Sequence, residues 1–433
     1  MALTNDAALS GLTVLDLSRV LAGPWATQIL GDLGADILKV ERPGTGDETR
    51  GWGPPYLKGS NGGDSDRAAY FAAANRNKRS VAVDMAHPDG AKLLRDLAAE
   101  SDIVIENFKV GGLARYGLDY ESLSAINPRL IYCSITGFGQ SGPYAARGGY
   151  DFVIQAMSGL MSVTGEPDGQ PQKVGVALTD VMTGLYAVIG ILAAVSERER
   201  SGLGQHIDLS LLDVGVAAMA NQAMNYLASG TAPTRMGNAH PNIVPYQVFP
   251  TRDGHVVIAV GNDSQFQRLC NALDRPDLAA DPAFATNRDR VGSRERLIPL
   301  LTDALASDTT TSWVGRLEDV GVPCGPVNTM AGVFDDPHVK ARGLALSLDD
   351  SAIGPVPGVA SPLNLSRTPA RAVTAPPALG ADTMAVLRER LALDDTALSR
   401  LRDAGAIGGR EASSTQSSKS GHEAGSSRSK ETS

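Results

Sequence analysis

A single acidic residue, Asp180, stands in an otherwise apolar stretch of the sequence. It is the only charged residue between positions 174 and 185. An acid in this setting either caps the start of a helix or acts as a functional carboxylate partly shielded from water. The pattern alone favours the cap, but the two roles are compatible, because a helix start supplies N–H groups that orient a carboxylate. A partly desolvated carboxylate is also a better nucleophile than one in bulk water.

Basic, amide and aromatic residues gather near the ends of the expected strands. Ligands of an open α/β sheet bind beyond the carboxyl ends of its strands. Side chains of these types at one rim can hold phosphates, with Phe108 stacked on a base. For any single Lys or Arg a solvated charged face is the commoner explanation, but the cluster as a set favours a phosphate site. The residues of this set are Arg42, Lys78, Arg79, Asn107, Phe108 and Arg115.

The elements that must position these residues alternate between β-rich runs and helix-like runs. Continuous apolar strands separated by helices predict a parallel sheet covered on both faces, which is an open, Rossmann-like α/β layer. The expected strands are 13–17, 36–41, 102–106, 130–134 and 206–209. The expected helices around them are 23–33, 88–100, 180–200 and 210–227.

The chain is too long for one compact core, so more than one domain is expected. A smaller α+β domain is predicted around a strand at 254–260, and the chain then returns to complete the first domain. The aperiodic segment 44–69 is a candidate active-site wall. The predicted divisions are 1–226 (large Rossmann-like domain, first part), 227–326 (small domain), 327–407 (return segment) and 408–433 (disordered Ser-rich tail).

Composition excludes several functional classes. The 433 residues carry 39 Lys and Arg against 48 Asp and Glu, a net charge of −9, which argues against a nucleic-acid-binding protein. Cys133, Cys270 and Cys324 are widely spaced, so neither a disulfide framework nor a structural metal site is predicted. The start lacks a signal-peptide pattern, and the longest apolar run is shorter than a membrane span. A cytoplasmic protein with no membrane partner is expected.

Short fragments along the chain carry a more specific signal. They lie at 14–24, 39–43, 75–80, 102–108, 134–143, 149–151, 179–180, 183–184, 204–205 and 321–327. In this order and spacing, over about residues 9–405, they resemble the family III CoA-transferases of CaiB/BaiF type. That group also contains formyl-CoA transferases and α-methylacyl-CoA racemases.

The resemblance implies that Asp180 is the catalytic nucleophile and that the phosphate-site set named above lies along a coenzyme A site. It implies acyl-CoA and small carboxylic acids as partners, with coenzyme A as a substrate carrier, no permanently bound cofactor and no metal. It also implies an interlocked homodimer, which fits the return segment of the chain.

Two positions discriminate between branches of the family. Racemase members carry His where this chain has Tyr150, and Tyr, with an unperturbed pKa near 10, is a poor proton carrier. Formyl-CoA transferases that use oxalate carry Gln where this chain has Leu21. The stretch 239–249 is most similar to the succinyl-CoA:glutarate branch, which handles short dicarboxylates.

A diacid substrate needs a cation for its distal carboxylate. The substrate-site candidates are Arg19, Arg50 and Arg147, with Tyr150 and His240 at the border. The predicted function is CoA transfer from an acyl-CoA, such as succinyl-CoA, to a short dicarboxylate. The alternatives are a racemase-like enzyme, a formyl-CoA/oxalate-type transferase and a non-catalytic acyl-CoA-binding protein.

Overall fold

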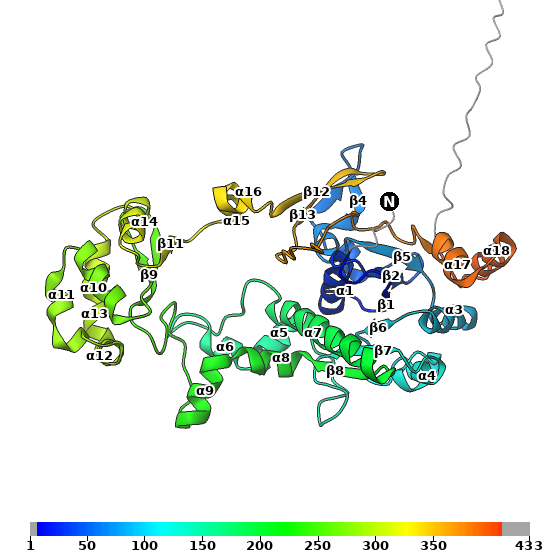
Figure 1. Cartoon of the computed structure of the whole chain (residues 1–433), viewed down its shortest axis with the longest axis horizontal. Coiled ribbons are helices and arrows are strands. Elements are labelled where there is room, and N and C mark those ends of the chain that lie inside the picture. The colour runs from blue at the N-terminus through cyan, green and yellow to red at the C-terminus, as the bar shows by residue number, and fades with distance from the viewer. Residues whose placement is uncertain (1–6, 409–433) are drawn as a thin grey trace, which may run out of the picture.

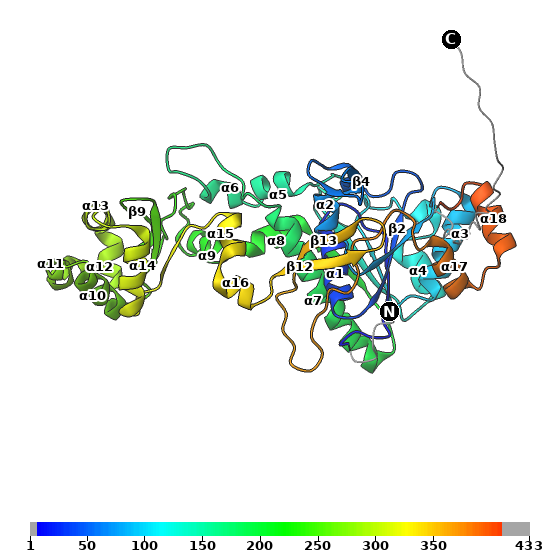
Figure 2. The same cartoon turned by 90° about the horizontal axis from the view of Figure 1, so that it is seen from above.

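The computed structural model describes residues 7–408. These form an elongated molecule with a large body built on a sheet and a small body at the far end of the long axis (Figures 1 and 2). The chain crosses from the large body to the small one and then returns. The predicted disordered tail lies, from residue 409 onward, outside the described residues, and the predicted division points of the chain remain predictions.

The large body is organised around a six-stranded parallel sheet, which confirms the predicted α/β class. In spatial order its strands are β5 (Lys78–Ala82), β2 (Asp36–Glu41), β1 (Thr13–Asp16), β6 (Ile103–Glu106), β7 (Ile131–Thr136) and β8 (His206–Ser210). The order runs outward in both directions from β1 and β6. These two strands therefore form a topological switch point, where sheets of this type bind ligands.

Both faces of the sheet are covered because its strands are apolar on both sides. Successive residues of a strand point to opposite faces, so Val14 joins one hydrophobic cluster and Leu15 joins the other. The cluster around Val14 contains residues of α1 (Ala22–Asp32) and α7 (Leu178–Ser201). The cluster around Leu15 contains residues of α3 (Pro88–Ala99), α4 (Tyr120–Ile126), α17 (Thr383–Leu391) and α18 (Asp395–Asp403).

Three local predictions need correction. The run that contains Lys78 is edge strand β5 and not a charged rim. The aperiodic segment 44–69 contains the 3₁₀ helix η1 (Glu48–Gly51) and a hairpin of β3 (Tyr56–Lys58) and β4 (Asp64–Ala68). The single helix expected at 210–227 is two helices. The other elements up to residue 229 are α2 (Ala69–Ala72), η2 (Ala114–Tyr116), α5 (Asp151–Met157), α6 (Leu160–Val163), α8 (Leu211–Ala218) and α9 (Ala220–Ser229).

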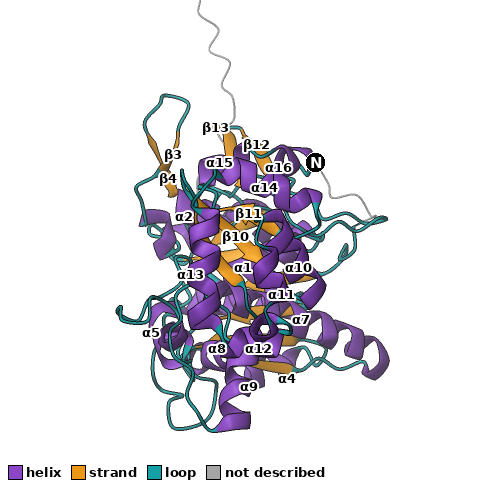
Figure 3. Cartoon of the chain, turned by 90° about the vertical axis from the view of Figure 1, so that its left-hand side faces the viewer, coloured by secondary structure: helices purple, strands orange, loops and turns teal. Residues whose placement is uncertain are grey.

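The small body has an antiparallel sheet in the order β11-β10-β9, whose strands β10 and β11 are labelled in Figure 3. It has a hydrophobic core of its own. Its elements are β9 (Tyr246–Pro250), β10 (His255–Ala259), α10 (Asp263–Ala272), α11 (Pro276–Ala280), η3 (Pro282–Phe284), α12 (Asn287–Gly292), α13 (Arg294–Leu305), α14 (Thr310–Asp319) and β11 (Cys324–Pro326). The return segment adds α15 (Met330–Asp335), α16 (Pro337–Ala341) and the hairpin of β12 (Ala345–Asp350) and β13 (Gly354–Val359) before α17.

Helix α7 is the long apolar helix expected from the sequence. Among residues 7–408 it is the one helix that is long and apolar enough to cross a membrane: it has 24 residues, and its most apolar 18-residue stretch has a mean hydropathy of 1.8. It packs against α1, where a Cβ on Gly184 would lie only 2.8 Å from the carbonyl oxygen of Ala22. Core helices of soluble proteins can be equally long and apolar, and part of α7 is buried inside the protein as such helices are.

Candidate active site

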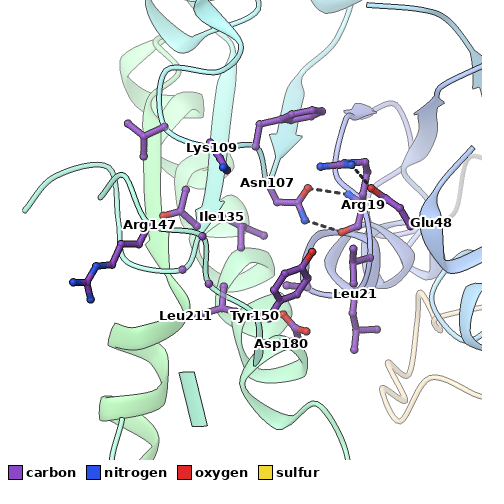
Figure 4. A pocket seen from close by; sticks show the side chains of 18 of the residues that line it. Arg19, Leu21, Glu48, Asn107, Lys109, Ile135, Arg147, Tyr150, Asp180 and Leu211 are labelled. Carbon is purple, nitrogen blue, oxygen red and sulfur yellow. Dashed lines mark hydrogen bonds and ion pairs between the residues drawn. The ribbon is translucent and has the colours of Figure 1, made fainter. Parts of the chain in front are cut away.

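A cavity of about 240 Å³ opens at the switch point between β1 and β6 (Figure 4). Its walls come from the segments after β1, β2, β6 and β7, from the residues just before α5 (Asp151–Met157), and from the first residues of α7 and α8. The lining residues used below are Arg19, Val20, Leu21, Glu48, Trp52, Asn107, Phe108, Lys109, Gly137, Arg147, Gly149, Tyr150 and Asp180.

Hydrogen bonds join the two loops that follow β1 and β6. The backbone N–H of Arg19 donates to Asn107 Oδ1 at 2.9 Å, and Asn107 Nδ2 donates to the Arg19 carbonyl at 2.7 Å. This reciprocal pair, drawn as dashed lines in Figure 4, ties the loops together at the mouth of the cavity. The role of Asn107 in the structure is therefore to shape the site as well as to border it.

A buried ion pair supports the loop after β1. Lys39 Nζ donates to Asp47 Oδ2 at 2.9 Å and to the Ser18 carbonyl at 3.2 Å. Burial alone raises the pKa of Asp47, but Lys39 and the N–H and hydroxyl of Thr49 lower it to about 2. Asp47 also accepts the N–H of Val20, which has φ +71°, a strained conformation for a β-branched residue. The pair thus holds a strained residue in the cavity wall.

Two glycines bring the loops after β7 and before α5 into contact. A Cβ on Gly137 or on Gly149 would lie 2.6 Å from the Cα of the other, so no larger residue fits at either position. Both glycines line the cavity. The Gly-rich sequence at 137–139 therefore serves the site through close approach of backbones.

Asp180 is the third residue of α7, and its carboxyl group faces the cavity beneath the ring of Tyr150 (Figure 4). The N-cap residue is Ala177, which provides no side-chain cap, so the prediction that Asp180 caps the helix is wrong. Burial, followed by the negative charge of Asp151, raises the pKa of Asp180 to about 7. The structure therefore places a desolvated carboxyl at the start of a helix and at the edge of a cavity.

This pKa predicts how the reactivity of Asp180 depends on pH. Only the ionised carboxylate can act as a nucleophile, so activity should rise with pH and be half-maximal near pH 7. Two pH units lower, about 1% of Asp180 is ionised, so activity should fall to about 1% of its maximum. The measurement is kcat/KM for an acyl-CoA from pH 5 to 9, which reports the free enzyme. A profile that is flat down to pH 5 would contradict this assignment.

A second cavity of about 460 Å³ adjoins the first and contains two of the predicted coenzyme A residues, Arg42 and Phe108. Arg19, Glu48 and Phe108 line both cavities and form the wall between them. The guanidinium of Arg19 is bonded to Glu48 and lies 4.9 Å from the centre of the Phe108 ring.

The structure places the remaining predicted coenzyme A residues elsewhere. Lys78 is fully buried, and its ammonium contacts Asp16 at 3.2 Å. Burial outweighs this partner and lowers the pKa of Lys78 to about 7. Arg79 pairs with Glu389 at 2.8 Å, away from both cavities. Arg115 is exposed, stacks on its neighbouring tyrosine and lines neither cavity.

The substrate-site candidates also separate into groups. Arg19, Arg147 and Tyr150 line the cavity that contains Asp180. Arg50 is buried, and its guanidinium donates two hydrogen bonds of 2.7 Å to the carboxylate of Glu41. Its charge is therefore paired inside the protein and does not face the cavity. His240 lies in the loop before β9, packs on a tyrosine ring and is not among the lining residues of either cavity.

Sequence reasoning missed several residues near Asp180. Asp151 accepts a hydrogen bond from the first turn of α7, and Lys109 and Trp52 line the cavity. Tyr70 contacts Trp52 edge to face, with ring centres 5.1 Å apart. Burial and then the charge of Asp180 raise the pKa of Tyr70, which places it close by. The aperiodic segment 44–69 pointed to Trp52, whereas no sequence pattern singled out Lys109. Within residues 7–408 no group of His, Cys, Asp and Glu side chains has the arrangement of a metal site.

Comparison with known proteins places the site in a family. A model described as CoA-transferase family III matches residues 9–383. The chain belongs to CoA-transferase family III. A protein of Agrobacterium fabrum named succinate–glutarate CoA-transferase is 51% identical over 90% of this chain and 97% of its own length.

Further relatives agree with this family assignment. Human succinyl-CoA:glutarate CoA-transferase is 42% identical over 94% of this chain and 91% of its own length. The crystal structure of a CaiB/BaiF family protein from Brucella suis is 52% identical, with a TM-score of 0.79, and covers 89% of this chain and all of that one. The predicted resemblance and fold class are confirmed, and this CoA-transferase acts on CoA thioesters.

Proposed function

We propose that this CoA-transferase moves coenzyme A from succinyl-CoA to a short dicarboxylate such as glutarate, through covalent intermediates on Asp180. The observation that carries the proposal is the desolvated carboxyl of Asp180 in a cavity that adjoins a second cavity, lined in part by Arg42 and Phe108, at the switch point. The names of the relatives from Agrobacterium fabrum and human support the choice of acids.

The first half of the reaction transfers coenzyme A to the enzyme. A carboxylate oxygen of Asp180 attacks the thioester carbon, the C–S bond breaks, and the thiolate of coenzyme A leaves a mixed anhydride behind. The thiolate then attacks the Asp180 carbonyl carbon and displaces the donor acid as its carboxylate. The products are an aspartyl-CoA thioester and free succinate.

The second half repeats these steps with the acceptor. The acceptor carboxylate attacks the aspartyl-CoA carbon and expels the thiolate, and the thiolate then attacks the acceptor carbonyl and releases Asp180. Every step exchanges one activated acyl bond for another, so ATP is not consumed. Gly137 lines the same cavity as Asp180, and a backbone N–H there that donates to an oxyanion would contribute about 3–4 kcal/mol.

A dicarboxylate has a second charge that the cavity must bind. Arg147 and Lys109 line the cavity and have no acidic partner within residues 7–408, whereas Arg19 is paired with Glu48. We assign the distal carboxylate to this basic side of the cavity. A guanidinium suits it because its fork binds a carboxylate through two hydrogen bonds.

A substrate panel tests the assignment. Succinyl-CoA is the donor, and glutarate, citramalate, itaconate, oxalate, formate and carnitine are offered separately as acceptors. We expect kcat/KM to be highest for a dicarboxylate of four to five carbons, with roughly 10-fold losses or more for acids without a distal carboxylate. Transfer to oxalate or formate alone would assign the chain to the alternative branch, and binding of acyl-CoA without transfer would make it a binding protein.

We also propose that the protein is a homodimer. Large apolar side chains are exposed on neighbouring helices α5, α7 and α9, including Phe152 (57% exposed), Ile189 (61%) and Leu227 (72%). Exposed apolar side chains of this size are typical of a protein interface. The expected interlocked arrangement fits the extended crossing and return of the chain (Figure 1).

An interface variant tests the dimer. Ile189→Asp is expected to shift the protein from dimer to monomer in sedimentation velocity, because it places a charge in an apolar contact. The control is Ile126→Asp, since Ile126 is 52% exposed at the end of α4, on a different helix. A wild-type protein that sediments as a monomer at micromolar concentration would refute the dimer.

A further inference from the structure

Helix α5 holds the chain segment that leads into α7. Its residues Asp151 and Gln155 are spaced i, i+4 and therefore lie on one face. Gln155 accepts the N–H of Val174 at 2.9 Å and donates to Asp151 Oδ2 at 2.7 Å. Gln155 is fully buried, so this connection lies inside the protein.

The carboxylate of Asp151 makes the decisive contacts. Its Oδ1 accepts the N–H of Thr179 at 2.8 Å, the hydroxyl of Thr179 at 2.6 Å and, more weakly, the N–H of Asp180 at 3.4 Å. The first N–H groups of a helix have no partners within the helix. Because the N-cap Ala177 has no side-chain acceptor, a carboxylate from another helix fills that role in α7.

We propose that Asp151 is a positioning residue for Asp180: it fixes the first turn of α7 and supplies the neighbouring negative charge under which Asp180 reacts. The inference rests on the proposed function of Asp180 as the nucleophile. Its geometric part follows from the three hydrogen bonds. Its electrostatic part follows from placing the carboxylate of Asp151 against the backbone of Asp180, with both residues partly buried.

The electrostatic effect has a direct chemical use. A carboxylate that is disfavoured in its charged form is more basic, and a more basic oxygen is the stronger nucleophile toward a thioester carbon. The oxygens of Asp151 accept several hydrogen bonds, whereas none is found for the side chain of Asp180 among the described residues. The other charged or titratable groups that face Asp180 are Tyr70 from α2 and the cavity residues Arg19, Glu48, Lys109, Arg147 and Tyr150.

The variant Asp151→Asn tests the electrostatic part. It keeps an oxygen for the N–H of Thr179 but removes the charge, so the acidic limb of kcat/KM should move about 1 unit toward lower pH. The control is Asp394→Asn, because Asp394 caps α18 by accepting the N–H of Ala397 at 2.8 Å and lies outside both cavities. The control changes a comparable helix cap and should leave the acidic limb of the kcat/KM profile at the same pH. An unmoved limb in folded Asp151→Asn overturns the inference.

The variant Thr179→Val tests the geometric part and does not depend on the folding of the first variant. It preserves every charge and nearly the same volume but removes the 2.6 Å bond to Asp151. We expect covalent labelling of Asp180 to slow by about 3- to 10-fold, with the acidic limb unmoved. Labelling at the wild-type rate would overturn the positioning role.

Trapping of the wild-type enzyme separates this inference from the proposed function. Hydroxylamine is added during turnover with succinyl-CoA, and the modified residue is mapped by mass spectrometry. A hydroxamate at residue 180 supports the proposed function, and the two variants then decide the role of Asp151. If wild-type enzyme carries no label at residue 180, the proposed function and the inference both fail.

Discussion

Asp180→Ala is expected to abolish CoA transfer, with a loss of roughly 10⁴- to 10⁶-fold in kcat. The variant removes the one carboxyl that the reaction passes through, and neither Asp151 nor Glu48 can replace it. Asp151 is engaged by the first turn of α7, and Glu48 is bonded to Arg19. Binding of coenzyme A should persist because the second cavity is lined by other residues. The measurements are turnover by chromatography of the acyl-CoA products and coenzyme A affinity by calorimetry.

A matched control exists on the next helix. Asp213 is the third residue of α8, as Asp180 is of α7, but its side chain is exposed and lies outside the cavity. Asp213→Ala should keep turnover within about 2-fold of wild type, as is usual for surface substitutions. Turnover by Asp180→Ala above a thousandth of the wild-type rate would remove Asp180 from the chemistry.

Lys39→Ala is expected to lower the free energy of unfolding by about 3–5 kcal/mol, the usual effect of removing one partner of a buried ion pair. Lys39 and Asp47 are both fully buried, so the carboxylate of Asp47 would remain without its cation. The same change loosens the segment that holds Val20 at φ +71°, so turnover should fall as well. Urea unfolding gives the stability, and the assay above gives the turnover.

An exposed pair provides the control for this prediction. The charged groups of Lys92 and Asp96 are 2.6 Å apart on α3, but their side chains are 67% and 39% exposed. Lys92→Ala should therefore change stability by only about 0.5 kcal/mol or less. Equal effects of the two lysine variants would show that burial of the Lys39–Asp47 pair carries no special weight.

Apolar periodicity predicted the sheet well because its strands are buried on both faces. Five of its strands were expected within a few residues of their observed bounds, and the parallel arrangement followed from the intervening helices. Strand β5 was missed because it begins with Lys78 and Arg79, whose charges are neutralised by residues distant in sequence. Local pattern cannot show such partners.

The active site was predictable only in part for the same reason. Asp180 stood out because a lone acid in an apolar stretch is a local signal. Arg50 was offered as a substrate cation, yet it is occupied by Glu41, and this pairing exists only after folding. Asp151 gave no signal because its importance depends on how α5 meets the start of α7. The reciprocal hydrogen bonds between Arg19 and Asn107 likewise join residues that are 88 positions apart in the sequence.

The hydrophobic core of the small body consists only of residues from 244 to 322, and it shares no member with the two cores of the large sheet. Heat should therefore melt the protein in two separate endotherms, so no single melting temperature describes it. Tryptophan emission can separate the two events, because Trp313 is buried in the small core while Trp25 and Trp52 belong to the large body. Lys39→Ala should lower the melting temperature of the large body and leave the melting temperature of the small body unchanged.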